Sequence, residues 1–332
     1  MFHEDRKRAF AQAYTSDARN QKNCLTIFRK TAEFEDESGF DVAEMPLDLA
    51  KSMMDKICGA STSSVRNIQT ILRAYTKWSK DNQYPVSDHG FKFDIEASDA
   101  VRSNYVASPM HLARSMDAVF HDANDLSILY LCRAYLWLAF MGLEEHEAIK
   151  VTSDDIHWDN MQIQLPSSTW YSYPIYAEAV YDLKAAVNMT SFSSKIGRGT
   201  KIIPRHPGRE ILRTFDNDQS LSEMITRSIR PTISRACKAA RMYAERSQCD
   251  ISGLCLGLSY NRVLQSGIFY RTFEEERLGV TPSFVKYAEV DVNRSFANDG
   301  STQMKRRFQT ALSDTRIRYE QEYARWKNVY KA

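Results

Sequence analysis

The sequence lacks the short motifs by which many enzymes and metal proteins are recognised from a single chain. Its six cysteines form no Cys-x-x-Cys pair and no spacing typical of zinc ligands. No glycine-rich phosphate loop and no nucleophile elbow occurs in its 332 residues. We therefore predict no metal site and no cofactor. Cys132 lies inside an apolar run and is predicted to be a small core residue, as expected in a reducing cytoplasm.

The chain also lacks a long apolar segment and a strong overall charge. Its first ten residues, MFHEDRKRAF, contain no apolar core of signal-peptide length. The longest apolar run carries Arg133 and is too short to span a bilayer comfortably, so a buried globular helix is the better interpretation. The net charge is only +2, so composition as a whole gives no indication of a nucleic-acid partner. We expect a cytoplasmic protein with no membrane contact.

The positive charges are nevertheless concentrated in one stretch. From Lys195 to Arg246 there are twelve Lys or Arg and five Asp or Glu, a net charge of +7, which leaves −5 for the rest of the chain. A basic segment in an otherwise slightly acidic protein is the pattern expected of a surface that binds a polyanion. The alternative is a solvated helical surface without a ligand.

The first third of the chain has the pattern of a small helical bundle. Helices are predicted over residues 18–38, Leu47–Ile57 and about Ser64–Lys80. The apolar positions of the third helix recur at helical spacing and predict one core face: Val65, Ile68, Ile71, Leu72, Tyr75 and Trp78. Residues 83–107 are predicted to link this bundle to a second domain.

The second domain is predicted to begin with helices and to continue into a small sheet. Ser108 and Pro109 suit a helix start, and the apolar helix that follows ends at Gly142, where a left-handed backbone is expected. Strands are predicted near Asp155–Trp158, Met161–Leu165 and Tyr173–Tyr176, with a tight turn at Asp159 and Asn160.

The remaining segments are predicted to be helices separated by a long loop region. Residues 177–187 have a helical pattern, and residues 190–217, which contain Gly and Pro, are interpreted as loops. A long basic helix is predicted over Ser220–Arg246, with a kink or split at Pro231. Further helices are predicted at about Tyr260–Glu276 and over the last thirty residues.

The stretch from Leu126 to Leu165 reads as an apolar helix (LSILYLCRAYLWLAFMG), a charged turn (LEEHEAIKV) and a hairpin segment (SDDIHWDNMQIQL). It resembles the core of the catalytic domain of tyrosine recombinases, the phage integrase family. The helices of the first third, ending in TSSVRNIQTILRAYTKWSKDN, are similar to that family's core-binding domain. The resemblance implies a mostly α fold with a small β-sheet or hairpin. It also implies two domains: a helical, SAM-like core-binding domain over residues 1–95, and a recombinase-like domain with a C-terminal helix over residues 96–332.

The groups that carry out strand transfer in this family are largely missing. The family uses a tyrosine nucleophile, two arginines that stabilise the negative charge of the transition state, and a lysine from the hairpin. Glu144 stands at the position of the first arginine, and the segment Pro166–Pro174 holds no lysine. The match to the family's His-x-x-Arg box, at His206 to Arg209, precedes the basic helix instead of following it, so we interpret it as coincidental. No tyrosine stands out as a nucleophile among Tyr287, Tyr319, Tyr323 and Tyr330. We therefore expect no enzymatic activity.

What remains is a set of side chains suited to DNA. Four cations of the predicted helix Ser220–Arg246 fall on one stripe: Arg227, Arg230, Lys238 and Arg241. Glu223 and Glu245 flank this stripe and do not interleave it. Isoleucines 225, 229 and 233 lie on another face and are predicted to pack inward. The start of the next helix combines donors and acceptors suited to base edges, although a helix cap followed by surface polar residues is the alternative. The expected DNA contacts are Arg66, Arg73, Lys77, Lys195, Arg198, Arg227, Arg230, Lys238, Arg241, Tyr260, Asn261, Arg262 and Gln265.

A two-lobed protein that holds one DNA site without cutting it can occlude a promoter. The plan of the chain is similar to that of the master repressors of lysogeny in SPβ-type Bacillus phages. That resemblance implies a transcriptional repressor that binds operator-like sites on double-stranded phage DNA, in the nucleoid of a bacterial host. It also allows a protein antirepressor, or self-association through the C-terminal helix. Two alternatives stay open: an active but divergent site-specific recombinase, and an interaction module that does not bind DNA.

Overall fold

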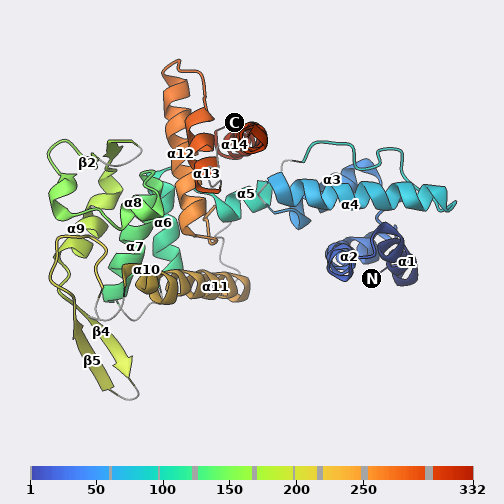
Figure 1. Ribbon diagram of the computed structural model, residues 1–332. Coiled ribbons are helices and arrows are strands. Elements are labelled where there is room, and N and C mark those ends of the chain that lie inside the picture. The colour runs from blue at the N-terminus through green and yellow to red at the C-terminus, as the bar shows by residue number, and fades with distance from the viewer. Residues whose placement is uncertain are drawn as a thin grey trace. The chain divides into compact units, whose positions relative to one another are not determined.

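The computed structural model describes residues 2–59, 62–95, 98–121, 126–166, 170–196, 199–214, 220–247, 253–295 and 302–331. It is mostly helical with a small three-stranded antiparallel sheet, as predicted (Figure 1). The chain forms two compact units, Met1–Val101 with Phe284–Ala332, and Arg102–Ser283. The division into functional domains at residue 95 stays a prediction. No helix in the described ranges is long and apolar enough to cross a membrane.

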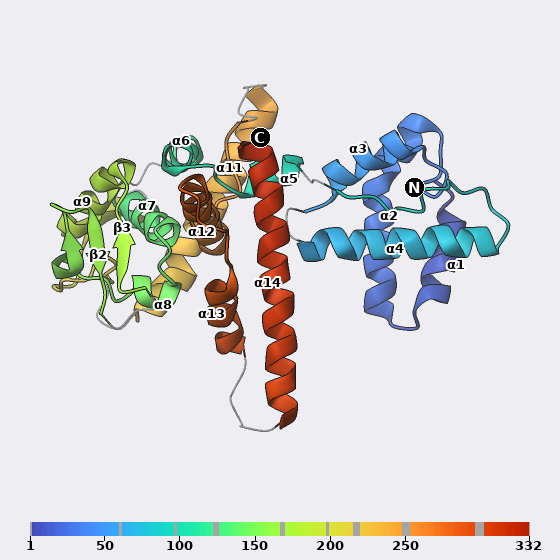
Figure 2. The same cartoon turned by 90° about the horizontal axis from the view of Figure 1, so that it is seen from above.

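The first unit is helical in its described residues. Its helices are α1 (Glu4–Tyr14), α2 (Ala18–Ser38), α3 (Leu47–Ile57), α4 (Thr62–Asp81), α13 (Val285–Ser295) and α14 (Thr302–Tyr330). The predictions of α2, α3, α4 and α14 are confirmed, whereas α1 and α13 were not predicted. α13 and α14 lie side by side (Figure 2). A further helix, α5 (Ser98–Asn104), lies in the predicted linker and contains the boundary between the two units.

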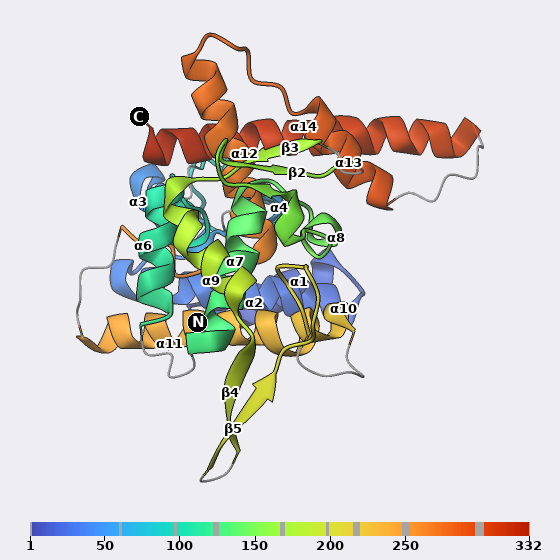
Figure 3. The ribbon, with the colours of Figure 1, turned by 90° about the vertical axis from the view of Figure 1, so that its left-hand side faces the viewer.

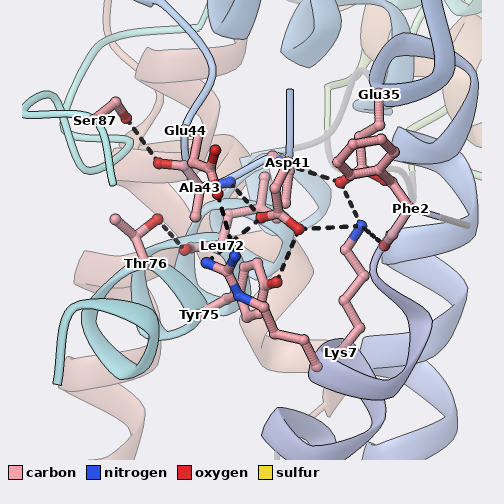
Figure 4. Close-up of polar contacts among 12 residues, drawn as sticks. Phe2, Lys7, Glu35, Asp41, Ala43, Glu44, Leu72, Tyr75, Thr76 and Ser87 are labelled. Carbon is pink, nitrogen blue, oxygen red and sulfur yellow. Dashed lines mark hydrogen bonds and ion pairs between the residues drawn. The ribbon is translucent and has the colours of Figure 1, made fainter. Parts of the chain in front are cut away.

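A buried cluster of charges joins α1 to the rest of this unit (Figure 4). The ammonium group of Lys7 is fully buried, donates to the Glu35 carboxylate, and lies 3.7 Å from Asp41 Oδ2. The Tyr75 hydroxyl donates to the same Asp41 oxygen at 3.0 Å. Burial raises the pKa of Glu35 even though Lys7 lies against it. Buried charges are retained only when they are paired in this way, so the cluster determines how α1 docks.

Tyr75→Phe is expected to lower the free energy of unfolding by about 2 kcal/mol, because it removes a hydrogen bond from a buried carboxylate. The aromatic packing of Tyr75 against Phe10 and Phe28 is retained in the variant. Chemical denaturation followed by circular dichroism measures the change. Tyr84→Phe is the matched control, since the Tyr84 side chain is exposed, and it should leave the stability unchanged. Equal losses in both variants would contradict a role for the Asp41 contact.

The second unit combines helices with two small sheets. Its helices of four or more residues are α6 (Pro109–Val119), α7 (Leu126–Phe140), α8 (Glu145–Ala148), α9 (Val180–Asn188), α10 (Leu221–Met224), the π-helical turn η3 (Ile225–Ile229), α11 (Arg230–Ser247) and α12 (Tyr260–Arg277). Two short 3₁₀ turns are η1 (Ser153–Asp155) and η2 (Ala177–Ala179). The strands are β1 (Ile156–His157), β2 (Gln162–Gln164), β3 (Ser172–Pro174), β4 (Ser191–Ile196) and β5 (Gly199–Pro204). The sheet order β1-β2-β3 is antiparallel throughout, with Ile163 opposite Ile156 and Tyr173.

The centre of this unit is the crossing of α7 and α12. Every residue of α7 from Ala134 to Phe140 is fully buried, and Cys132 is buried with them, as predicted. Gly142 follows with φ +98°, which confirms the expected left-handed backbone. The Arg271 guanidinium donates to the Phe140 carbonyl at 3.0 Å and so satisfies one of the open carbonyls at the end of α7. The crossing fixes where the first residues of α12 lie.

One local prediction about this unit is confirmed and one is wrong. The turn predicted at Asp159 and Asn160 is present, and its left-handed residue is Met161, with φ +54°. Loops longer than two residues commonly place the left-handed residue at their end, after the turn itself. Residues 190–217 are not all loop, because Ser191–Ile196 and Gly199–Pro204 pair over six residues each. The cross-strand hydrogen bonds of this ribbon outweigh the turn-forming tendency of its glycines.

Candidate nucleic-acid interface

The predicted basic helix is continuous, but it contains a π-helical turn just before Pro231. Ser220 caps α10 by accepting a hydrogen bond from the Glu223 amide at 3.2 Å. The π-helical turn Ile225–Ile229 then leads into α11, where Pro231 occupies the second position. Proline lacks a backbone N–H, and the wider turn accommodates it without breaking the helix. The predicted disturbance at Pro231 is therefore a π turn.

This helix has a buried apolar face and an exposed basic face, as predicted. The inward isoleucines are buried, with relative exposures of 3% for Ile225, 0% for Ile229 and 3% for Ile233. The cations lie on the outer side, and Arg227, Arg230, Lys238 and Arg241 are all exposed. The apolar face anchors the helix, which leaves the basic face available to a ligand.

α11 and the start of α12 form the walls of an open pocket of about 510 Å³. We call it the α11–α12 pocket. It is lined by Tyr135, Arg230, Ile233, Ser234, Cys237, Lys238, Arg241, Gly257, Leu258, Ser259, Tyr260 and Asn261. Five of the thirteen residues selected from the sequence, three of them cations, thus come together at one place, although they belong to two separate predicted helices.

The cations of the pocket differ in their surroundings. Lys238 is exposed, and the Arg241 guanidinium donates to the Leu256 carbonyl at 3.1 Å while lying over Gly257. A Cβ at position 257 would lie 2.5 Å from the Ser103 backbone oxygen and 2.7 Å from Arg241 Nη2, and glycine is needed there because the Ser103 oxygen belongs to the backbone. Arg241 therefore both shapes the pocket and contributes charge to it.

Arg230 has an acidic partner that the sequence analysis missed. Its guanidinium forms an ion pair with Glu145, and its Nε lies 3.4 Å from the Tyr135 hydroxyl. Tyr135 itself donates to Glu145. The hydrogen bonds with Tyr135 and Glu145 raise the pKa of Arg230. Arg227 is also paired, at 3.5 Å from Glu223. The expectation that acids only flank the stripe is therefore wrong for Arg230.

The start of α12 presents fewer polar groups to solvent than expected. Tyr260 is 5% exposed, and its hydroxyl donates to the Leu143 carbonyl at 2.8 Å, so in this structure that hydroxyl is not available to a base. Burial also raises the pKa of Tyr260. The assignment of a base-reading role to Tyr260 is corrected: its ring forms the floor of the pocket against Tyr135, 4.4 Å away between ring centroids.

Arg262 and Gln265 share a buried tyrosine hydroxyl. Arg262 Nη1 donates to the Tyr105 hydroxyl at 3.0 Å, and that hydroxyl donates to Gln265 Oε1 at 3.1 Å. The Arg262 guanidinium also lies 5.3 Å from the centre of the Tyr105 ring. Asn261, in contrast, is exposed at the pocket. Of the four polar residues predicted at this helix start, Asn261 is the one whose side chain lies in the open.

The basic ribbon β4–β5 extends away from the helices of the second unit (Figures 1 and 3). Lys195 lies on β4, opposite Thr200 of β5, and Arg198 lies outside the described residues. Ile202 is 68% exposed. No acidic residue occurs from residue 183 to residue 209 of the sequence. The major groove of DNA is wide enough to admit a two-stranded ribbon. The basic composition of this ribbon suits such a contact.

The cations predicted in the first unit lie along α4. Arg66 is exposed and donates to Gln321 of α14 at 3.2 Å, and Lys77 is exposed. The Arg73 Nε donates to the Phe91 carbonyl at 2.8 Å, which ties α4 to the segment after it. Arg73 therefore has a structural contact in addition to any role on DNA.

The positions that resemble catalytic ones have structural contacts. The backbone N–H of Glu144 donates to Glu147 at 2.9 Å at the start of α8, and Glu147 also accepts a hydrogen bond from Tyr173 at 3.0 Å. Arg209 is exposed and pairs with Asp154. The Tyr319 side chain is buried, at 7% relative exposure, and its hydroxyl donates to Asp291 at 3.0 Å. In the described ranges no group of three or more His, Cys, Asp or Glu side chains is placed to hold a metal ion.

No protein-family model matches the chain, and no curated protein matches it either. The resemblance to tyrosine recombinases therefore rests on the residues quoted in the sequence and stays a prediction.

Proposed function

We propose that this chain is a double-stranded DNA-binding protein that holds a specific site without cutting it. The observation that supports the proposal is the convergence of Arg230, Lys238 and Arg241 with Asn261 in one open pocket. Cations bind phosphate oxygens irrespective of sequence, whereas an amide can distinguish adenine by donating and accepting at once. A pocket that has both kinds of group suits a backbone phosphate and a neighbouring base edge.

Charge and shape favour duplex DNA over a small anion. α11 has eighteen residues and is therefore about 27 Å long, which is the length of several successive phosphates on a duplex. The basic ribbon lies in the same unit of the chain and offers a second contact. A small anion would need the pocket alone, and neither the long basic face nor the ribbon would have a ligand.

Cleavage is not part of the proposal because the required charges are absent or inverted. Loss of a charge-stabilising arginine in phosphoryl transfer lowers the rate by roughly 10³- to 10⁵-fold. Glu144 would place a negative charge where the reaction needs a positive one. A protein that binds a site and leaves it intact acts by occupancy, so the role we propose is that of a transcriptional repressor at operator-like sites in phage DNA.

Selection from a library of random-sequence duplexes tests the proposal. The full chain is incubated with the library, bound duplexes are amplified, and the affinity for the enriched sequence is measured at several salt concentrations. We expect one enriched motif and an affinity that falls steeply with salt. No enrichment together with no binding at low salt would refute DNA binding and favour the interaction-module alternative.

A nicked suicide duplex that contains the selected motif tests the absence of chemistry. We expect no covalent protein–DNA adduct after denaturing electrophoresis. An adduct that disappears in one Tyr→Phe variant would overturn the non-cleaving proposal in favour of a divergent recombinase.

A further inference from the structure

One cation of the α11–α12 pocket has an internal counter-ion. Glu145 is the first residue of α8, and its two carboxylate oxygens accept from Tyr135 of α7 and Arg230 of α11. Three separate elements therefore hold one ion pair at the wall of the pocket. In the described part of the chain no carboxylate contacts Lys238 or Arg241. Among the three cations of the pocket, Arg230 is therefore the one whose charge is balanced by a carboxylate.

The ion pair remains accessible from solvent. The side chain of Arg230 is 52% exposed and that of Glu145 is 33% exposed. A pair at this exposure contributes little to the stability of the fold, so it can be exchanged at low cost. A phosphate diester and a carboxylate offer a guanidinium the same bidentate geometry and the same charge. A phosphate that enters the pocket therefore competes directly with Glu145 for Arg230.

We propose that Glu145 is a built-in competitor of the DNA backbone, which limits the affinity of the pocket by occupying Arg230. This inference rests on the proposed function and describes the regulation of that same pocket. While Glu145 holds Arg230, only Lys238 and Arg241 are available to phosphate. When the carboxylate is displaced, Arg230 makes one further phosphate contact. The hydrogen bond from Tyr135 holds Glu145 near Arg230, so the ion pair forms again when the phosphate dissociates.

The variant Glu145→Gln removes the competing charge and retains an oxygen that accepts from Tyr135. We expect the full chain with this change to bind the selected duplex about three- to tenfold more tightly than the wild type. The plot of log affinity against log salt should become steeper by about 0.9, the value for one additional phosphate contact. Fluorescence anisotropy with a labelled duplex measures both quantities, and a thermal melt establishes that the variant folds.

Two controls make the test specific. In Glu145→Gln combined with Arg230→Ala the gain should disappear, because Glu145 acts through Arg230. Glu274→Gln changes the net charge equally and removes a carboxylate 3.4 Å from Arg277, outside both the pocket lining and the predicted DNA contacts, and it should leave the affinity within about twofold of the wild type.

Unchanged affinity and salt slope in Glu145→Gln, with wild-type binding intact, would overturn the competitor role and leave the proposed function in place. A gain that persists without Arg230, or an equal gain in Glu274→Gln, would also overturn it, because general charge would then explain the effect. Failure of both the wild type and Glu145→Gln to bind any duplex at low salt is a distinguishable result, which refutes the proposed function and the competitor role together.

Discussion

Lys238→Glu is expected to lower the affinity of the full chain for duplex DNA by about thirtyfold, on selected and random sequences alike. Two unit charges 4 Å apart in water interact by about 1 kcal/mol, and charge reversal turns this attraction into repulsion. The change of about 2 kcal/mol corresponds to about thirtyfold in affinity. Lys238 is exposed in the α11–α12 pocket, so the substitution alters the charge without disturbing the core. The salt slope should become shallower by about 0.9.

Arg235→Glu is the matched control for this change. Arg235 lies on the same helix, is exposed, and does not line the pocket. The two variants have the same net charge, so they differ only in whether the reversed charge faces the pocket. We expect Arg235→Glu to weaken binding by less than about threefold, as measured by anisotropy titration. Equal losses in the two variants would mean that overall charge, and not the pocket, governs binding.

Several helices of this protein were predictable because their ends are marked locally, whereas α1 and α13 were not predicted. The Ser108 side chain accepts from the His111 amide at 3.2 Å where the helix start was predicted, and Gly39 ends α2 with φ +73°. Apolar residues at helical spacing indicate which face is buried, since the period depends only on the helix itself. These signals lie within a few residues of the structure that they predict.

The β4–β5 ribbon was not predictable in the same way. Its two strands pair in register from Ser191 opposite Pro204 to Ile196 opposite Gly199, so neither strand is stable without its partner. The glycines and prolines of residues 190–217 are strong local signals for loops. Cross-strand pairing, which such local signals do not report, decides in the opposite direction.

The candidate pocket was predictable in its members and not in their contacts. Lys238, Arg241 and Asn261 were selected because residue type and helical position suffice to place a polar side chain on an outer face. The partner of Arg230 is Glu145, which is 85 residues away along the chain. The carbonyl that binds the Tyr260 hydroxyl belongs to Leu143, 117 residues away. Contacts at these separations depend on how α7, α8, α11 and α12 pack, which local patterns do not specify.

Gly267→Ala is expected to lower the free energy of unfolding by about 3 kcal/mol or more. Gly267 is buried in α12, and a Cβ there would lie 1.9 Å from the Phe140 carbonyl oxygen and 2.7 Å from its carbon. These are backbone atoms of the α7 end, so no side chain can rotate away and the two helices must move apart. Overpacking of a tight core costs about 1–3 kcal/mol, and more where backbone has to shift.

Helices intrinsically prefer alanine to glycine, which stabilises this variant, but the gain is smaller than the cost of the clash. Alanine is favoured over glycine by about 1 kcal/mol inside a helix, which does not offset the clash. Because α12 begins at the pocket, the same displacement should also weaken DNA binding of the folded fraction. Gly253→Ala is the control, since a Cβ there meets nothing within 4 Å, and its melting temperature should equal that of the wild type. If Gly267→Ala had the same melting temperature as Gly253→Ala, α7 and α12 would not cross as closely as described.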